Sequence, residues 1–397
     1  MKILLVDDEE QVLKGVSRNI TLEEEAWEVR TALSGERALD ILAVEHFDVI
    51  VSDMRMPGMD GAELLQRIDT SYPRMLRVVL SGQADQETVL RAVKPMHQYL
   101  AKPCDPARLI EVIKRAEIFQ QTIKSSEVLD AIGRSNCLPA FPEVVHEINR
   151  EMDSDTGTSK SVADIIAKDT ALTARVLQLA NSSIFAPRHA INDVDRAVSM
   201  IGMDMIRSLA MTQALYSQNP EHDHLVSAKK LVDHGVAVAA NGKKLASLAK
   251  YSKDDSNSTF SAALLHDVGK LILLNAFPDA YKYAIDQAAQ TDRQIEEVEM
   301  DVFGASHQGI GAYLFGLWGL PAEVNEAVAS HHSFLACAKA EGKPRQVVFA
   351  ANWIEGNENE DSLHELVRVD EDEVVAERFI NQISQWREIL VQSEVGV

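Results

Sequence analysis

The fold of the N-terminal third is decided by residues 47–61, FDVIVSDMRMPGMDG. The run Phe47–Ser52 is short and apolar, as in strands that are buried on both faces, and Asp53 follows it directly. The next stretch, Gly61–Ile68, has the apolar spacing of a helix. A buried strand followed by a helix is the repeating unit of parallel sheets.

Four more strand-like runs flank this unit, and they are Lys2–Val6, Trp27–Thr31, Leu76–Leu80 and Gln98–Ala101. Helix-like stretches such as Gly35–Val44 lie between them. Five strands with intervening helices within about 120 residues predict a doubly wound α/β domain with a parallel sheet.

Polar residues stand where these strands end. Asp7 and Asp8 follow the first strand, Asp53 the third, Ser81 the fourth and Lys102 the fifth. Sites of doubly wound sheets form at the carboxyl ends of the strands. Three carboxylates meeting there would repel one another without a cation, and all-oxygen ligation suits Mg²⁺. A carboxylate beside Mg²⁺ and a lysine is suited to accept a phosphoryl group. A loop residue or helix cap would explain one such acid, but not five polar groups.

Residues 1–120 resemble a response-regulator receiver domain, which has a flavodoxin-like fold. The matching residues are the Asp7-Asp8 pair, VSDMRMPGMDG around Asp53, LSG at Ser81, and Tyr99 with Lys102-Pro103. The resemblance implies that Asp53 is the phosphoacceptor and that a sensor histidine kinase or phosphotransfer protein is the donor.

The resemblance also assigns the residues around Asp53. It implies that Asp7, Asp8, Asp53 and the backbone carbonyl of Arg55 hold Mg²⁺. Ser81 and Lys102 would bind the phosphoryl oxygens, and Tyr99 would be the switch aromatic. The Lys102-Pro103 peptide is expected to be cis.

The segment Ala107–Ile132 contains neither proline nor glycine, and its apolar residues form one helical stripe. Its first half is expected to pack on the receiver sheet. The linker helix over residues 121–137 has two interpretations, a rigid connector or a dimerising helix, and the sequence leaves both open. Gly133 and the Pro-containing stretch after it mark a domain boundary near 125–140.

The remaining 260 or so residues are predicted to be all-helical. Helical spacing is found in Val162–Lys168, Leu172–Asn181, Val194–Gly202, Met205–Ala214, Lys229–Leu248, Ser261–Leu274, Ile295–Phe303, His307–Leu317, Ala322–Ser330 and Arg345–Trp353. The segment SKDDSNS, residues 252–258, is predicted to be a polar loop.

Histidines in these helical segments suggest a metal centre. The candidate ligands are His234, His266, Asp267, His307, His331 and His332. Neutral imidazoles with a carboxylate suit a divalent transition metal such as Fe or Mn, and two adjacent metals could share Asp267. A lone histidine is more often an ordinary core or surface residue. The spacing alone favours neither interpretation.

Residues 138–352 resemble the HDOD domain, a regulatory and mostly non-catalytic relative of the HD phosphohydrolases. The matching stretches are LPAFPEVVHEINREM, ADIIAKDTALTARVLQLANSSIFA, INDVDRAVSMIGMDMIRSLAM and LLHDVGK. The resemblance implies two helical lobes, at 138–215 and 225–355. An acidic segment with a final helix, at 356–397, follows them.

Within the second lobe the resemblance implies that His234 is the first HD histidine and His266-Asp267 the HD pair, followed by a matching Lys270. The later histidines match those of the HD-GYP phosphodiesterases. Two features depart from that pattern. No GYP-like motif follows His332, and the last metal-binding acid is replaced by Asn352. An amide is a poorer ligand than a carboxylate, which weakens one metal position.

Composition limits the classes of function. The 397 residues carry a net charge of −22, of which −5 lies in residues 1–125. This charge argues against direct DNA binding and against a membrane surface as partner. No apolar run approaches the roughly 18 residues of a membrane span, and the acids after residue 6 argue against a signal peptide. Three cysteines without paired spacing predict a reducing compartment, the cytoplasm.

Two classes of function remain. In the first, phosphorylation of the receiver switches an HDOD output domain that acts through a downstream protein partner. In the second, the HD-like lobe is a metal-dependent phosphohydrolase acting on a cyclic dinucleotide or another nucleotide. A lobe that binds such a nucleotide without cleaving it lies between them.

Overall fold

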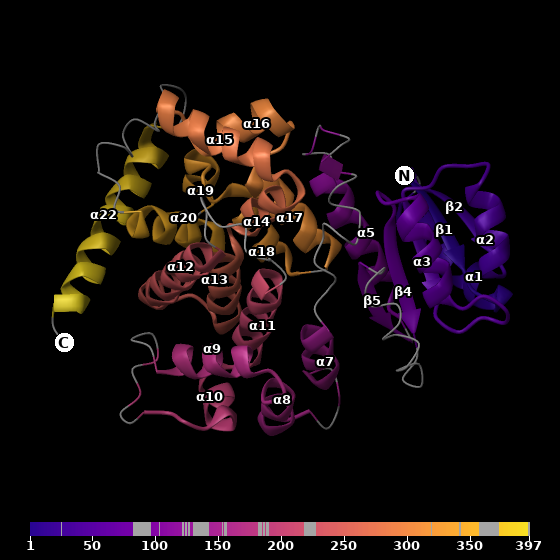
Figure 1. Ribbon diagram of the computed structural model, residues 1–397, viewed down its shortest axis with the longest axis horizontal. Helices are drawn as coiled ribbons and strands as arrows, with labels where there is room; N and C mark the ends of the chain where they lie inside the picture. Colours follow the sequence, from indigo (N-terminus) through magenta and orange to yellow (C-terminus); the bar gives the residue numbers. More distant parts are fainter. Residues whose placement is uncertain are drawn as a thin grey trace. The chain divides into compact units, whose positions relative to one another are not determined.

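The computed structural model describes residues 1–24, 26–81, 97–102, 104–120, 123, 125, 128–129, 143–152, 154, 157–181, 185, 187, 190–217, 228–318, 320–340, 343–356 and 373–395 (Figure 1). The chain divides into two compact units. The first comprises Met1–Glu143, Ile272–Ser306 and Tyr313–Gly319, and the second Val144–Leu271, His307–Ala312 and Leu320–Val397.

A five-stranded sheet forms the centre of the N-terminal domain. Its strands are β1 (Lys2–Val6), β2 (Glu28–Ala32), β3 (Val49–Asp53), β4 (Leu76–Ser81) and β5 (Gln98–Ala101). They are parallel and run in the order β2-β1-β3-β4-β5. The doubly wound, flavodoxin-like sheet predicted from the sequence is therefore confirmed.

Helices cover both faces of this sheet (Figure 1). On one face α1 (Glu10–Glu23) contacts α5 (Pro106–Gln120), and on the other α2 (Gly35–Leu42) contacts α3 (Gly61–Ser71). Strand β3 is buried along its whole length, as its apolar sequence predicts. Because β1 and β3 are neighbours, Asp7, which follows β1, and Asp53, which ends β3, come together at one edge.

The helix after the sheet is shorter than predicted. Helix α5 ends at Gln120, and the described residues Ile123 and Ser125 are not helical. The Ser125 hydroxyl accepts a hydrogen bond from the Val128 N–H at 3.3 Å, and its carbonyl accepts one from Leu129 at 3.1 Å. This is how a capping serine starts a new turn, so the helix expected over 107–132 is interrupted. Most of residues 121–137 lie outside the described part, and their role stays a prediction.

The rest of the chain is helical, as predicted. The first group is α7 (Glu143–Met152), α8 (Ser159–Ile166), α9 (Thr170–Ala180), α10 (Val194–Ile201) and α11 (Met203–Ser217). In this group α10 packs against both α8 and α9. The later helices are α12 (Ala228–Leu248), α13 (Lys253–Leu265), α14 (Val268–Ala276), α15 (Pro278–Thr291), α16 (Ile295–Phe303), α17 (His307–Leu317), α18 (Ala322–Ser330), α19 (Phe334–Ala338), α20 (Pro344–Glu355) and α22 (Glu373–Val395).

Helix α13 is the centre of the second unit, where it contacts α12, α18 and α20 (Figure 1). Its close approach to α12 depends on a glycine. A Cβ atom on Gly235 would lie 2.6 Å from the carbonyl oxygen of Leu264, closer than real contacts allow. This packing brings His234, on α12, next to the end of α13 at His266.

The predicted polar loop at 252–258 is wrong, because α13 begins at Lys253. Ser252 caps this helix by accepting a hydrogen bond from the Asp255 N–H at 3.1 Å. Asp254 and Asp255 occupy the first turn, where the helix dipole favours acids. The polar residues that suggested a loop are the residues that start a helix.

The predicted helical stretch Ser261–Leu274 is two helices, with a break at His266-Asp267 between α13 and α14. Helix α7, helix α15 and the short α19 were not among the predicted helical stretches. Residues 357–372, which hold most of the acidic run, lie outside the described part, so the expectation of a solvated segment stays a prediction.

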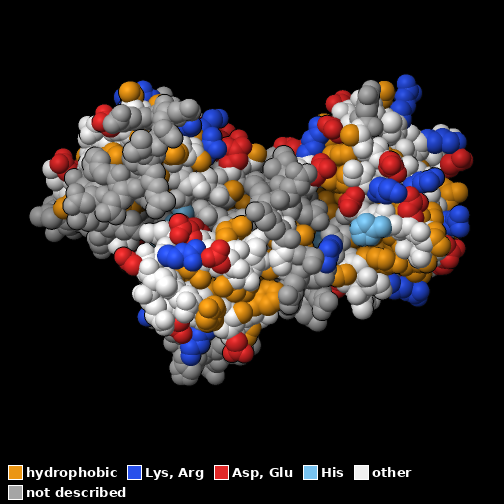
Figure 2. Space-filling view, turned by 90° about the horizontal axis from the view of Figure 1, so that it is seen from above, with side chains coloured by type: hydrophobic (Ala, Val, Ile, Leu, Met, Phe, Trp, Pro, Cys, Tyr) orange, Lys and Arg blue, Asp and Glu red, His pale blue; other side chains and the backbone are white. Residues whose placement is uncertain are grey.

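Two observations concern the surface. None of the described helices is both long enough and apolar enough to cross a membrane. On the face drawn in Figure 2, the basic and acidic side chains of the described residues are interspersed.

Candidate functional site

The receiver site is built at the ends of β1, β3 and β5. Asp7 and Asp53 are buried, with 3% and 7% of their surfaces exposed. The Lys102 ammonium lies between them, 2.9 Å from Asp7 Oδ2 and 2.5 Å from Asp53 Oδ1. One cation therefore bridges two buried carboxylates at the carboxyl ends of the strands, where the sequence placed all three residues.

The electrostatics of this group follow from burial. Loss of solvent raises the pKa of Asp53, against the opposing effect of Lys102. Burial alone would lower the pKa of Lys102, but the hydrogen bonds and charges of Asp53 and Asp7 raise it. The lysine is therefore held in its charged form, in the position where it can face an anion.

The turn after β3 holds Asp53 in place. The Arg55 N–H donates to Asp53 Oδ2 at 3.1 Å, and the Asp60 side chain caps α3 by accepting from Glu63 N–H at 2.9 Å. Gly61 starts α3 directly against the strand, since a Cβ atom there would lie 2.2 Å from the carbonyl oxygen of Asp53. The contribution of Gly61 was missed in the sequence, although its place at the start of the predicted helix was visible.

Other predicted receiver residues are placed less completely. Asp8 is exposed at the same strand end. Ser81 ends β4 and Tyr99 lies in β5, but their side chains lie outside the described part. Pro103 is also outside it, so the expected cis peptide stays a prediction. The role expected for the Arg55 carbonyl stays a prediction as well.

The donor atoms at this edge fit Mg²⁺, which prefers oxygen ligands and keeps several waters. Asp7 and Asp53 supply carboxylates that both contact Lys102, and Asp8 follows Asp7 in the chain. Among the described residues, however, these three acids do not form a group whose ligand atoms all lie within 4.8 Å of one another. The Lys102 ammonium occupies the space between the two buried carboxylates.

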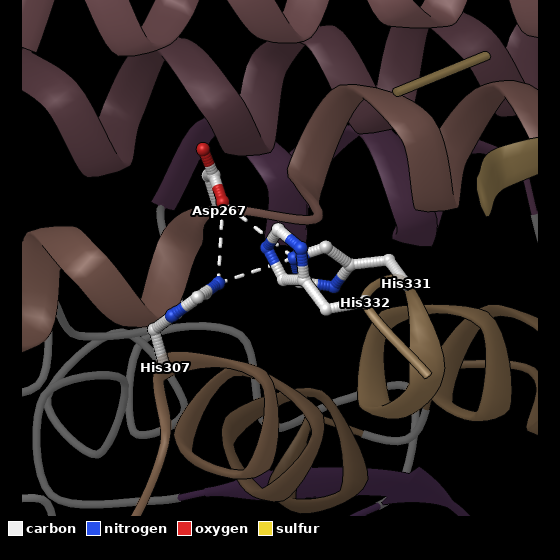
Figure 3. A group of neighbouring side chains, drawn as sticks. All are labelled: Asp267, His307, His331 and His332. Carbon is white, nitrogen blue, oxygen red and sulfur yellow. Dashed lines mark hydrogen bonds and ion pairs between the residues drawn. The ribbon is translucent and has the colours of Figure 1, made fainter. Parts of the chain in front are cut away.

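A second cluster lies in the second unit, and Figure 3 shows four of its side chains pointing toward one another. Asp267 lies between α13 and α14, His307 begins α17, and His331 and His332 follow α18. Their ligand atoms all lie within 4.8 Å of one another. His307 Nε2 and His331 Nε2 are each 3.6 Å from Asp267 Oδ1 and 3.2 Å from each other.

A second group overlaps the first through Asp267. His234, His266 and Asp267 also place their ligand atoms within 4.8 Å of one another. His266 Nε2 lies 3.5 Å from Asp267 Oδ2. The structure thus brings together all six candidate ligands predicted from the sequence, in two groups that share the carboxylate.

Backbone carbonyls orient two of these imidazoles. His266 Nδ1 is 2.7 Å from the Ala263 carbonyl, and His331 Nδ1 is 2.7 Å from that of Val328. A carbonyl can only accept, so each Nδ1 carries the hydrogen and each Nε2 presents a lone pair to the cluster. This is the outer hydrogen bond that metal-binding histidines usually make.

Unpaired polar atoms remain in the cluster. His266 Nε2, His332 Nε2 and Asp267 Oδ1 are buried and have no hydrogen-bond partner within the described structure. Such atoms are rare in folded proteins because each costs roughly 1–3 kcal/mol. These unpartnered atoms are distributed over the two groups that share Asp267, and imidazole nitrogens beside a carboxylate form a donor set for a cation.

The protonation states suit a metal. Burial lowers the pKa of His266 to about 3, and it also lowers the pKa values of His331 and His332. Burial alone would raise the pKa of Asp267, but His266, Lys270 and the other histidines hold it well below its usual range. These three imidazoles are therefore neutral and the carboxylate is ionised, the forms that bind metal.

Two further residues shape this site. A Cβ atom on Gly269 would lie 1.9 Å from the His307 carbonyl oxygen, so the glycine lets α14 reach the start of α17. Lys270 Nζ lies 2.9 Å from Asp267 Oδ2. The sequence matched this lysine by its place in LLHDVGK, and the three-residue spacing from Asp267 on a helix would have indicated the ion pair.

Asn352, which stands where the last acid was expected, contacts the first histidine of the pattern. Its Oδ1 lies 3.0 Å from His234 Nε2. Asn352, which replaces the expected acid, therefore contacts the histidine cluster.

Comparison with known proteins gives two family matches. The model of the response regulator receiver domain matches residues 3–114, and that of the HDOD domain matches residues 138–334. The HDOD domain protein from Geobacter sulfurreducens has a solved structure that covers 72% of this chain and 94% of its own. Its TM-score is 0.48 and its identity is 21%.

Curated relatives match mainly the N-terminal domain. The hydrogenase transcriptional regulatory protein HoxA of Cupriavidus necator is 35% identical over 116 residues, which are 29% of this chain and 23% of HoxA. The response regulator protein FleR of Pseudomonas aeruginosa is 35% identical over 123 residues, which are 30% of this chain and 25% of FleR. The matches thus span about a quarter of the length of these relatives.

Proposed function

The chain belongs to the response regulators, with a receiver domain followed by an HDOD domain, and we propose that phosphorylation of Asp53 controls what the HDOD domain binds. The observation that carries the proposal is the contact of one ammonium, that of Lys102, with both Asp7 and Asp53. A buried carboxylate next to a fixed cation is the arrangement that phosphoryl transfer requires.

The transfer is a simple substitution. A carboxylate oxygen of Asp53 attacks phosphorus, the P–N bond of the phosphohistidine in a kinase or phosphotransfer protein breaks, and the imidazole leaves. Lys102 then pairs with the phosphoryl oxygens. Mg²⁺, held by Asp7, Asp8, Asp53 and the Arg55 carbonyl, would neutralise the charge on those oxygens.

The output is a change of surface. A phosphoryl group adds negative charge at Asp53, and Ser81 and Tyr99 would respond by moving inward. We propose that this change reaches the HDOD domain and alters its affinity for a downstream protein partner. A cytoplasmic location, the absence of direct DNA contact and a homodimer that forms through residues 121–137 remain predictions.

Labelling of the full chain with acetyl phosphate and Mg²⁺ tests the first step. The native protein should gain one phosphoryl group by intact mass, which hydroxylamine removes as expected of an acyl phosphate, and Asp53→Asn should gain none. Asp40→Asn, which changes an exposed acid on α2, is the matched control and should be labelled normally. Labelling that persists in Asp53→Asn would place the phosphoacceptor elsewhere.

Capture of binding proteins tests the second step. Native protein and Asp53→Asn are compared with and without acetyl phosphate, and the amount of each captured protein is measured. We expect at least one protein whose capture changes only with native, phosphorylated protein. Identical sets and amounts in all four samples would remove phosphorylation control of binding.

A second candidate function is favoured by the buried unpaired atoms around Asp267. The donor set fits a divalent metal such as Fe²⁺ or Mn²⁺, which would supply Lewis acidity for phosphodiester hydrolysis. Turnover of cyclic dinucleotides with either metal would support a receiver-gated phosphohydrolase. Binding by calorimetry without turnover would support a nucleotide sensor. If the protein neither binds nor cleaves these nucleotides, protein binding remains as the proposed function of the HDOD domain.

A further inference from the structure

We infer that the histidine cluster holds one metal ion, bound by Asp267, His307, His331 and His332, rather than two ions that share Asp267. The inference rests on the metal centre of the second candidate function and names its occupied position. The two oxygens of the Asp267 carboxylate differ in the groups that face them.

The Oδ1 side of Asp267 presents a complete ligand set. His307 Nε2 and His331 Nε2 both face Oδ1 at 3.6 Å, and His332 adds a third imidazole to the group. Oδ1 and His332 Nε2 have no hydrogen-bond partner within the described structure. One carboxylate and three imidazoles make four ligands, the number of a tetrahedral Zn²⁺ site.

The Oδ2 side already has a cation. Lys270 Nζ is 2.9 Å from Oδ2, and its side chain is 19% exposed. The ammonium thus occupies the oxygen that a second ion would share. His266 Nε2 is unpaired, but it faces this same oxygen at 3.5 Å, so the lysine supplies the positive charge near its lone pair.

The remaining ligands on this side are also weakened. His234 Nε2 is engaged by Asn352 Oδ1 at 3.0 Å, which leaves this histidine with a neutral partner. A carboxylate at position 352 would add the negative charge that offsets a second dication, and the amide adds none. Among the described residues, the second group therefore has two histidines and a carboxylate oxygen held by lysine, with no further acid.

The stoichiometry of bound zinc tests this assignment. The full chain is loaded with Zn²⁺ in excess Mg²⁺, which occupies the receiver, then desalted and analysed by plasma mass spectrometry. We expect about one zinc per chain. His332→Gln changes a residue found only in the first group, and it should reduce the zinc to near zero. His234→Gln changes a residue found only in the second group and should retain one.

The double variant Asn352→Asp, Lys270→Met should raise the content toward two, because it adds an anion and removes the competing ammonium. Circular dichroism of each variant verifies folding, and Zn²⁺ affinity by competition with a chelator gives a second readout. Two zinc ions in the native chain, or loss of zinc in His234→Gln but not in His332→Gln, would overturn the inference.

Failure of this inference and failure of the proposed functions give different results. A native chain without zinc overturns the inference and leaves the labelling of Asp53 unaffected. One zinc without any turnover supports the inference and rejects only the phosphohydrolase.

Discussion

A glycine sets the geometry of the receiver site as firmly as its charged residues do. Gly61 lies so close to β3 that a methyl group there would approach the Asp53 carbonyl oxygen at 2.2 Å and the Met54 Cα at 3.0 Å. Neither atom belongs to a flexible side chain, so the backbone of the phosphorylation loop would have to move. A loop shifted in this way would pull Asp53 away from Lys102.

Gly61→Ala is therefore expected to lower the free energy of unfolding by about 1–3 kcal/mol, as overpacking does, and to slow labelling of Asp53. Gly15→Ala is the control, because its added Cβ meets no atom within 4 Å. That change, in the exposed middle of α1, should raise stability by about 0.5–1 kcal/mol and leave labelling unchanged. Chemical denaturation and acetyl phosphate labelling measure both. Equal behaviour of the two variants would refute the close-packing argument.

A buried histidine makes the receiver sensitive to acid. His97, next to β5, is 5% exposed, and its Nδ1 accepts the Arg77 N–H at 3.2 Å. The Arg77 guanidinium pairs with Asp69 at 2.9 Å. Burial first, and the charge of Arg77 second, hold the pKa of His97 well below 6.5. The unfolded chain takes up a proton that the folded chain does not, so stability is full above about pH 6.5 and falls as the pH drops.

We expect native protein to lose about 1.4 kcal/mol more stability than His97→Gln between about pH 7.5 and pH 5.5. Other buried histidines are present in both proteins, so their contributions cancel in the difference. Urea denaturation of the receiver transition at the two pH values measures this. The same pH dependence in both proteins would show that His97 is not the sensitive group.

At the scale of elements, the Ser252 cap stabilises the start of α13. Ser252→Ala removes the hydrogen bond from the Asp255 N–H and should lower the free energy of unfolding of the second unit by about 1 kcal/mol. Ser258→Ala, within the same helix, removes a hydroxyl of the same kind from a position that is not a cap, and should cost less. Thermal or chemical denaturation compares the two, and equal losses would argue against capping.

The sequence predicted elements well where apolar periodicity was unbroken. The five strands were located within one or two residues, and α16, α17 and α18 were located at their observed ends. It failed at Ser252–Ser258, where helix-capping residues resemble a loop, and at His266-Asp267, where two helices meet with continuous apolar spacing. Helix α15 buries Tyr281. Tertiary contacts cause this burial, and the local sequence pattern does not predict it.

The sequence predicted which residues form each candidate site better than it predicted the contacts between them. The placement of Asp7, Asp53 and Lys102 at the carboxyl ends of parallel strands explains why they meet at one edge. The histidines were candidates from their placement in helical segments, and the resemblance gave them their roles. The contact of His234 with Asn352 depends on the distance between two helices that lie far apart in the chain. The contact of Lys270 with one Asp267 oxygen is local, and its three-residue spacing was visible in the sequence. Only the folded structure shows that Oδ1 of Asp267 faces His307 and His331 while Oδ2 contacts Lys270.

At the scale of the whole molecule, a phosphorylation site in one domain would control binding by the other. Each domain matches a known family. Each also contains buried polar residues that come together from its own helices or strands. The proposal that one controls the other makes a claim about residues far from Asp53. That claim is tested by an observable in the HDOD domain itself.

Hydrogen–deuterium exchange of the full chain, with and without the phosphoryl analogue beryllofluoride and Mg²⁺, is the most direct measurement. We predict that exchange changes in the receiver and also in peptides from residues 143–395, and that Asp53→Asn abolishes both changes. A change confined to residues 3–114 in the native chain would contradict the account, because Asp53 would then be modified without effect on the HDOD domain.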